Sequence, residues 1–153
     1  MILLLRVDHR LLHGQVAFSW IQNLGADCIL IANDSVVNDE LRKTTMKLAK
    51  PQEVKLVIKN IEDSIQALKS GVTDKYKLFI VVESVEDAYK IAKEVDEIKQ
   101  INLGGVKARE NSRNISKAVN LLEEEENLLK ELQSLGIEIE IRQVANDTKV
   151  LYR

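Results

Sequence analysis

The hydrophobic and polar positions of this chain form blocks that are typical of an α/β protein. Short apolar runs rich in Ile, Val and Leu recur at about residues 2–7, 27–32, 54–58, 77–82 and 98–103. They show little alternation, as expected for parallel strands that are covered on both faces. Segments with helical spacing separate the runs. We therefore predict one domain over residues 1–153, an open, doubly wound and mostly parallel sheet with helices on both faces.

The ends of the predicted helices are marked by capping residues and by charge. The helices are expected to begin near His13, Asn38, Asn60, Ser84 and Glu123. Polar side chains there can accept hydrogen bonds from the free backbone N–H groups. Acidic residues in the first turn interact favourably with the positive end of the helix dipole. After the last helix, which ends at Gly136, isoleucines alternate with charged residues over 137–142. This alternation predicts a strand with one solvent-facing side, at a sheet edge where an antiparallel strand is allowed.

A polar and cationic cluster follows the first apolar run. Between Arg6 and Val16 the chain reads RVDHRLLHGQV, which places two guanidiniums, a carboxylate and two imidazoles before the first helix. In open α/β sheets, ligands bind at such strand ends. The first helical turn has no acidic residue, so the backbone N–H groups of Gly14, Gln15 and Val16 are available to an anion. The cluster therefore predicts a nucleophile beside a phosphate site.

His13 is the candidate nucleophile of this site. A histidine with an ordinary pKa of about 6.5 is largely neutral in the cell, so a ring nitrogen can attack a phosphoryl donor. Arg6 and Arg10 are the candidate phosphate clamps, because the arginine fork matches the phosphoryl oxygens. Asp8 is expected either to pair with an arginine or to hold one imidazole nitrogen so that the other can react.

Other interpretations of the same residues stay open. Arg6 and Asp8 share a side of the strand and could form a strand-end salt bridge. His9 and His13 are four residues apart, which in a helix would suggest metal ligands, but they flank a turn and the lone cysteine, Cys28, lies in an apolar run. His13 could also be the general base of a hydrolase or isomerase. We predict no metal and no cofactor.

The sequence resembles a known family in several segments. Segment 6–16, with the pattern RxDxRLLHGQV, resembles the phosphorylation-site motif of the IIB components of the mannose/fructose/sorbose family of the phosphoenolpyruvate-dependent sugar phosphotransferase system (PTS). The resemblance continues through 32–34, 101–105 and 140–144 and covers essentially the whole chain. It implies a sheet of about seven strands with the last strand antiparallel. His9 stands where the family usually has other polar residues and is not carried over as catalytic.

The resemblance implies a phosphocarrier enzyme. In this family the histidine of the His-Gly-Gln segment, here His13, accepts a phosphoryl group, typically on Nδ1, from the phosphohistidine of the IIA component and passes it to a sugar. The implied partners are IIA, the membrane components IIC and IID, and the sugar, and a homodimer stays open. The alternative from the residues alone is a non-enzymatic anion- or nucleotide-binding regulatory domain, in which His13 only contacts phosphate.

One loop is expected to border the site. Residues 104–114 follow a predicted strand end and contain two glycines and three cations, namely Gly104, Gly105, Lys107, Arg109 and Arg113. Glycine pairs usually mark turns, so a mobile, solvated surface loop explains these residues equally well. The resemblance favours a loop beside His13 whose cations steer the incoming phosphorylated carrier.

Composition and charge agree with this class of protein. The 153 residues are 45% hydrophobic, which is enough for one sizeable core. The 22 basic and 24 acidic residues give a net charge of −2, so no basic surface for nucleic acid is indicated. We expect neither a signal peptide nor a membrane span, because no run of about twenty apolar residues occurs. The expected location is cytoplasmic, with membrane association only through IIC and IID.

Overall fold

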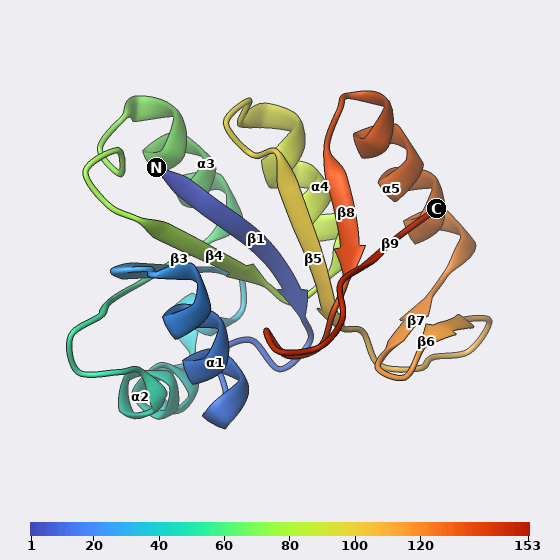
Figure 1. The fold of residues 1–153 in the computed structure, drawn as a ribbon. Helices are drawn as coiled ribbons and strands as arrows, with labels where there is room; N and C mark the ends of the chain where they lie inside the picture. Colours follow the sequence, from blue (N-terminus) through green and yellow to red (C-terminus); the bar gives the residue numbers. More distant parts are fainter.

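The computed structural model describes residues 1–153 and contains a seven-stranded sheet with helices on both faces (Figure 1). The strand order is β3-β2-β4-β1-β5-β8-β9, and only β8 and β9 pair in antiparallel fashion. The strands are β1 (Ile2–Asp8), β2 (Cys28–Ala32), β3 (Lys55–Lys59), β4 (Leu78–Val82), β5 (Gln100–Gly105), β8 (Glu138–Ile141) and β9 (Val150–Leu151). The predicted fold class is confirmed.

The helices divide the core into two layers. They are α1 (Gly14–Leu24), α2 (Glu40–Ala49), α3 (Ile61–Ser70), α4 (Val85–Glu94) and α5 (Glu123–Ser134), with a short 3-10 turn η1 (Val36–Asn38). Helices α1 and α2 lie on one face, and α3, α4 and α5 lie on the other (Figure 1). In β1, Leu4 enters the first layer, whereas Leu5 and Val7 enter the second. Because both faces of the strands are buried, their apolar runs are unbroken. No helix combines the length and the apolar character that crossing a membrane requires.

Helix α1 differs from its neighbours in how it begins. The side chains of Asp39, Asn60 and Ser84 each accept a backbone N–H at the start of α2, α3 and α4. Such a cap contributes about 1 kcal/mol. His13 precedes α1 in an extended conformation and makes no side-chain cap, and the first turn of α1 has no acidic residue. The amino end of α1 therefore keeps its positive dipole end unneutralised.

Strand β1 lies at the centre of the sheet, between β4 and β5. After β1 the chain turns to α1 on one face, whereas after β4 and β5 it continues to helices on the opposite face (Figure 1). Such a reversal leaves a crevice at the carboxyl ends of the strands, where α/β proteins bind ligands. The polar cluster that follows β1 stands at this point.

The predicted edge position of segment 137–142 is wrong. Strand β8 in this segment runs parallel to β5 and is covered on its other side by β9, which is the antiparallel edge strand. The alternating polar side is also not uniformly in water, since Glu140 is only 4% exposed and pairs with Arg142 at 2.9 Å. A buried ion pair produces the same alternation as a solvated face. The antiparallel strand at the edge is thus β9.

The expected mobile loop at residues 104–114 is only partly a loop. Gly104 and Gly105 lie inside β5, and β6 (Arg113–Ser116) forms a separate hairpin with β7 (Val119–Leu121). The glycine pair therefore marks no turn. In the strand, it allows the backbone to approach the charged side chains of Arg6 and Asp8 closely.

Candidate functional site

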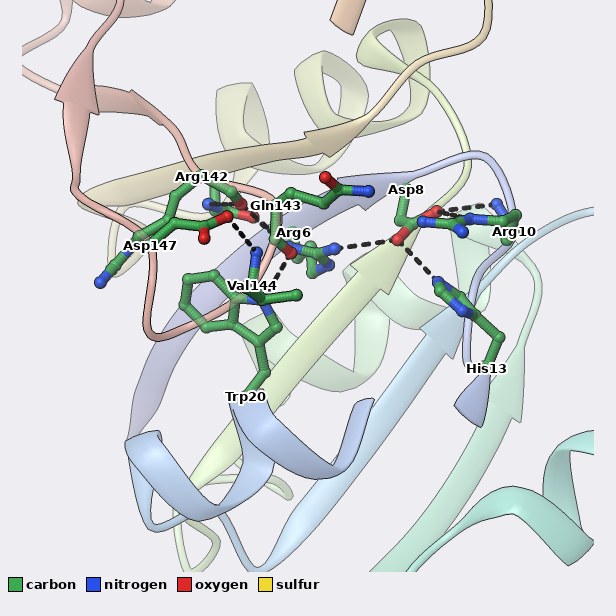
Figure 2. Close-up of polar contacts among 10 residues, drawn as sticks. Arg6, Asp8, Arg10, His13, Trp20, Arg142, Gln143, Val144 and Asp147 are labelled. Carbon is green, nitrogen blue, oxygen red and sulfur yellow. Dashed lines mark hydrogen bonds and ion pairs between the residues drawn. The ribbon is translucent and has the colours of Figure 1, made fainter. Parts of the chain in front are cut away.

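Asp8 is the centre of the polar cluster. It is fully buried at the end of β1 and accepts hydrogen bonds on both oxygens (Figure 2). Its Oδ2 lies 2.9 Å from Nη2 of Arg6 and 3.0 Å from Nε2 of His13. Its Oδ1 accepts the backbone N–H of Arg10 at 3.0 Å and the Nε–H of the same residue at 3.3 Å. Both roles proposed for Asp8, arginine pairing and imidazole holding, occur together.

The charge state of Asp8 follows from these contacts. Burial alone would raise the pKa of this carboxyl group, but the hydrogen bond with His13, the charge of Arg6 and the backbone N–H of Arg10 outweigh it. Together they hold the pKa of Asp8 well below its usual range. Asp8 is therefore an anion at every physiological pH and acts only as a hydrogen-bond acceptor.

The imidazole of His13 is oriented by Asp8. A carboxylate can only accept, so the 3.0 Å contact places a proton on Nε2 of His13. In the neutral ring, Nδ1 then carries the lone pair. The His13 side chain is 25% exposed, which leaves it accessible from outside. The contact thus selects the tautomer in which Nδ1 carries the free lone pair.

The turn between β1 and α1 is anchored beneath His13. Leu11 and Leu12 are buried in the core layer of α1 and α2, and the Leu11 N–H donates to the Asp8 carbonyl at 2.9 Å. Leu11 has a φ of 59°, a left-handed conformation that a branched side chain rarely adopts. Gly14 also has a positive φ, of 44°. Burial of the two leucines offsets the backbone strain and fixes His13 at the amino end of α1.

The structure corrects the interpretation of Arg6 as a phosphate clamp. Arg6 is 2% exposed, and its guanidinium donates to Asp8 and to the Oδ1 of Asn102 at 2.7 Å. Because residues 6 and 8 share one side of the strand, they form the strand-end salt bridge that the sequence left open. Arg10 has a 42% exposed side chain beside Asp8 and stays the candidate clamp. The predicted phosphate contacts of Gly14, Gln15 and Val16 stay a prediction from the helix start.

The predicted docking cations are mostly paired within the chain. Arg109 forms a two-pronged ion pair with Glu125, and Arg113 forms one with Glu126. Lys107 is exposed and makes no ion pair. The sequence could not show these pairs, because their acidic partners belong to the first turn of α5, where they also face the helix dipole.

Several residues of the site were not predicted from the sequence. Trp20 of α1 donates its Nε1–H to the carbonyl oxygen of Gln143 at 3.1 Å. The guanidiniums of Arg6 and Arg142 lie 5.2 and 4.7 Å from the centroid of its ring. Asn102 lies fully buried beside Arg6. A polar residue within an apolar strand run is the one signal that could have indicated Asn102.

Metal ligation has no geometric support in these residues. No group of three or more His, Cys, Asp or Glu side chains is placed to hold a metal ion. His9 and His13 do not converge on a third ligand, and Cys28 is buried in β2. The cluster contains one oriented imidazole, one exposed guanidinium and the uncapped amino end of a helix.

The comparisons with known proteins decide the family. Residues 2–152 match the family described as the PTS system sorbose subfamily IIB component. The chain belongs to this family of IIB components.

Solved and sequenced relatives support this membership. The sorbose-specific EIIB component of Klebsiella pneumoniae is 31% identical over 149 residues, which are 97% of this chain and 91% of that protein. The crystal structure of the IIBSor domain of the sorbose permease from Klebsiella pneumoniae superposes with a TM-score of 0.92, over 98% of this chain and 92% of that one. The mannose-specific EIIAB component of Escherichia coli is 27% identical over 96% of this chain, which spans 46% of that protein. This IIB component is therefore a protein of PTS sugar phosphotransfer.

Proposed function

We propose that this IIB component carries a phosphoryl group on Nδ1 of His13. The hydrogen bond between Nε2 of His13 and Oδ2 of Asp8, 3.0 Å long, is the observation that carries the proposal. It fixes the proton on Nε2 and leaves the Nδ1 lone pair for attack. The free amino end of α1 and the Arg10 guanidinium are placed to balance the charge of the arriving phosphoryl oxygens.

The transfer needs no proton movement on His13. The Nδ1 lone pair forms the new N–P bond, and the bond between phosphorus and the donor nitrogen breaks with its electron pair going to the donor. The His13 ring keeps its Nε2 proton and so becomes a cation. Asp8, a buried anion in contact with that proton, stabilises the cation as it forms. The same positive ring is a good leaving group when an acceptor oxygen later attacks the phosphorus.

The donor and acceptor follow from the family. The donor is a phosphohistidine of a IIA component, and the acceptor is a sugar bound by membrane components IIC and IID. The match to an EIIAB component, whose name joins A and B parts, supports a IIA partner. The protein is then a phosphohistidine–sugar phosphotransferase that works in the cytoplasm at the membrane surface.

Covalent labelling tests this function. Incubation with phosphoenolpyruvate and the upstream carriers, including IIA, should leave a phosphate that is labile in acid and stable in base. Phosphorus and nitrogen NMR should place it on Nδ1 of His13. An acid-stable phosphate ester would contradict the proposal. Phosphate binding without any covalent label would instead favour the anion-binding regulator.

Arg10→Lys should slow phosphorylation of His13 about tenfold, a loss of roughly 1.4 kcal/mol in the barrier. Lysine keeps the charge but loses the planar fork and the Nε–H that donates to Asp8. Single-turnover transfer from phosphorylated IIA measures the rate. Arg153→Lys, at the exposed carboxyl end, is the matched control and should transfer at the parent rate. If the Arg10→Lys protein is phosphorylated at the parent rate, Arg10 is a solvated loop residue without a role in transfer.

Lys107→Ala should weaken the salt dependence of transfer from IIA. Lys107 is exposed and unpaired, so its charge attracts a phosphorylated partner. The double changes Arg109→Ala with Glu125→Ala and Arg113→Ala with Glu126→Ala should change the dependence less, because each removes an ion pair whose charges cancel. Stopped-flow rates at low and high ionic strength compare the three variants. Equal effects of all three would mean that the ion pairs open when IIA docks.

A further inference from the structure

Asn102 occupies an unusual place for a neutral polar residue. It lies in β5 directly opposite Arg6 of β1 and is fully buried. Its Oδ1 accepts from Nη1 of Arg6 at 2.7 Å, and its Nδ2 donates to the carbonyl oxygen of Arg142 at 3.0 Å. Both ends of the amide are therefore used. Since its partners fix which end is oxygen, the amide can hold Arg6 in only one orientation.

The remaining surroundings of Arg6 leave it little freedom. The Trp20 ring lies against its guanidinium, and the Arg142 carbonyl accepts a second, longer bond from Nη1 at 3.3 Å. The backbone of Gly104 touches the guanidinium so closely that any Cβ at this position would overlap it. This contact explains the glycine in the middle of β5. The Nη2 end of the same guanidinium binds Asp8.

These contacts determine which hydrogen-bond donors each oxygen of Asp8 can bind. An arginine next to a carboxylate tends to bind it with two parallel hydrogen bonds, one to each oxygen. Here Nη1 binds Asn102, and Nη2 is the one Arg6 nitrogen that hydrogen-bonds to Asp8. Oδ1 therefore stays available to Arg10, and Oδ2 keeps the direction that meets Nε2 of His13.

We propose that Asn102 is a positioning residue for phosphoryl transfer, which keeps Arg6 from binding both oxygens of Asp8 and so preserves the Asp8–His13 contact. The proposal rests on His13 as the phosphoryl acceptor. Without the Asn102 amide, Nη1 of Arg6 is free to turn toward Asp8. The hydrogen bond between Asp8 and Nε2 of His13 then weakens. The neutral His13 ring then populates the tautomer with its proton on Nδ1. In that tautomer Nδ1 has no lone pair for attack.

Asn102→Ala and Asn120→Ala test this role as a matched pair. Asn120 also donates from Nδ2 to a backbone carbonyl, that of Val106 at 3.1 Å, but it has no contact with Arg6. Nitrogen NMR of the neutral His13 ring should show mainly the Nε2–H tautomer in the parent and in Asn120→Ala. Asn102→Ala should show a mixture of the two tautomers.

Kinetics give the second measurement. Asn102→Ala should lower the maximal rate of His13 phosphorylation by phosphoramidate, a small donor, about tenfold. With phosphorylated IIA as the donor, the loss should appear in kcat and leave KM unchanged, because Asn102 is buried and cannot contact IIA. A parent-like tautomer together with a parent-like rate in Asn102→Ala would overturn the proposal.

Gly104→Ala provides an independent perturbation if Asn102→Ala folds poorly. Its new Cβ would overlap the Arg6 guanidinium and displace it, so the same tautomer mixture is expected. The two readouts also separate this proposal from the proposed function. If His13 of the parent takes up no phosphoryl group, the function fails. The tautomer still reports whether Asn102 orients Asp8 and His13, and an unchanged tautomer in both variants rejects its role.

Discussion

His13→Ala should abolish covalent phosphorylation and leave the fold intact. The substitution removes the only nucleophile that the site orients, so label from phosphorylated IIA should fall to background. The side chain is partly exposed and makes one hydrogen bond, so its loss should cost only about 1 kcal/mol of unfolding free energy. Radiolabel transfer and thermal unfolding measure the two effects.

His9→Ala is the natural control for this experiment. His9 follows Asp8 directly, but its Nδ1 is buried without a hydrogen-bond partner, so its ring does not hydrogen-bond to the carboxylate through this nitrogen. This variant should keep most of the parent's phosphorylation rate. A peptide digest that places the label on His9 would refute the assignment of His13 and the proposed mechanism with it.

Asp8→Asn should have the next largest effect, on both rate and stability. The amide cannot supply the negative charge that stabilises the cationic ring, and it does not fix the His13 tautomer. We expect phosphorylation to slow about a hundredfold. Removing one partner of a buried ion pair leaves Arg6 uncompensated, which should cost about 3–5 kcal/mol of unfolding free energy. Single-turnover kinetics and urea unfolding measure the two losses.

The stability loss in Asp8→Asn should also depend on pH in a defined direction. Because the folded-state pKa of Asp8 is held below the usual value of about 4, its ionised form stabilises the fold above that pH. The contribution is lost as pH falls through the folded-state pKa. The difference in unfolding free energy between parent and variant should therefore be flat from about pH 5 to 8 and shrink in acid. Asp34→Asn, at an exposed carboxylate, should show no comparable loss. A parent-like rate in Asp8→Asn would show that the carboxylate does not orient His13.

The sequence predicted those parts of the molecule that depend on neighbouring residues. Apolar runs buried on both faces identified the parallel strands, and the strand-end cluster placed Asp8 near His13, five positions away. The supporting contacts of Arg6 were beyond reach, because Asn102 and Arg142 are 96 and 136 positions away in the chain. Their meeting depends on β1, β5 and the end of β8 lying side by side, which no local pattern records.

The incorrect predictions about the edge strand and the loop cations also have physical causes. The two-residue strand β9 is too short to produce a periodic pattern, so the alternating segment before it has the pattern of an edge strand. Glu140 and Arg142 neutralise one another inside the protein, and a paired buried charge has the same sequence pattern as a solvated one. The same ambiguity explains the loop cations, since Arg109 and Arg113 find acidic partners on α5.

The indole of Trp20 gives this site an optical reporter of its own. Trp20 is the single tryptophan of the chain, and it touches the guanidiniums of both Arg6 and Arg142. Indole fluorescence responds to the charges that lie against the ring. Its emission therefore follows any shift of Arg6, one contact away from the carboxylate that orients His13. Rearrangement around His13 can thus be followed in real time without an attached dye.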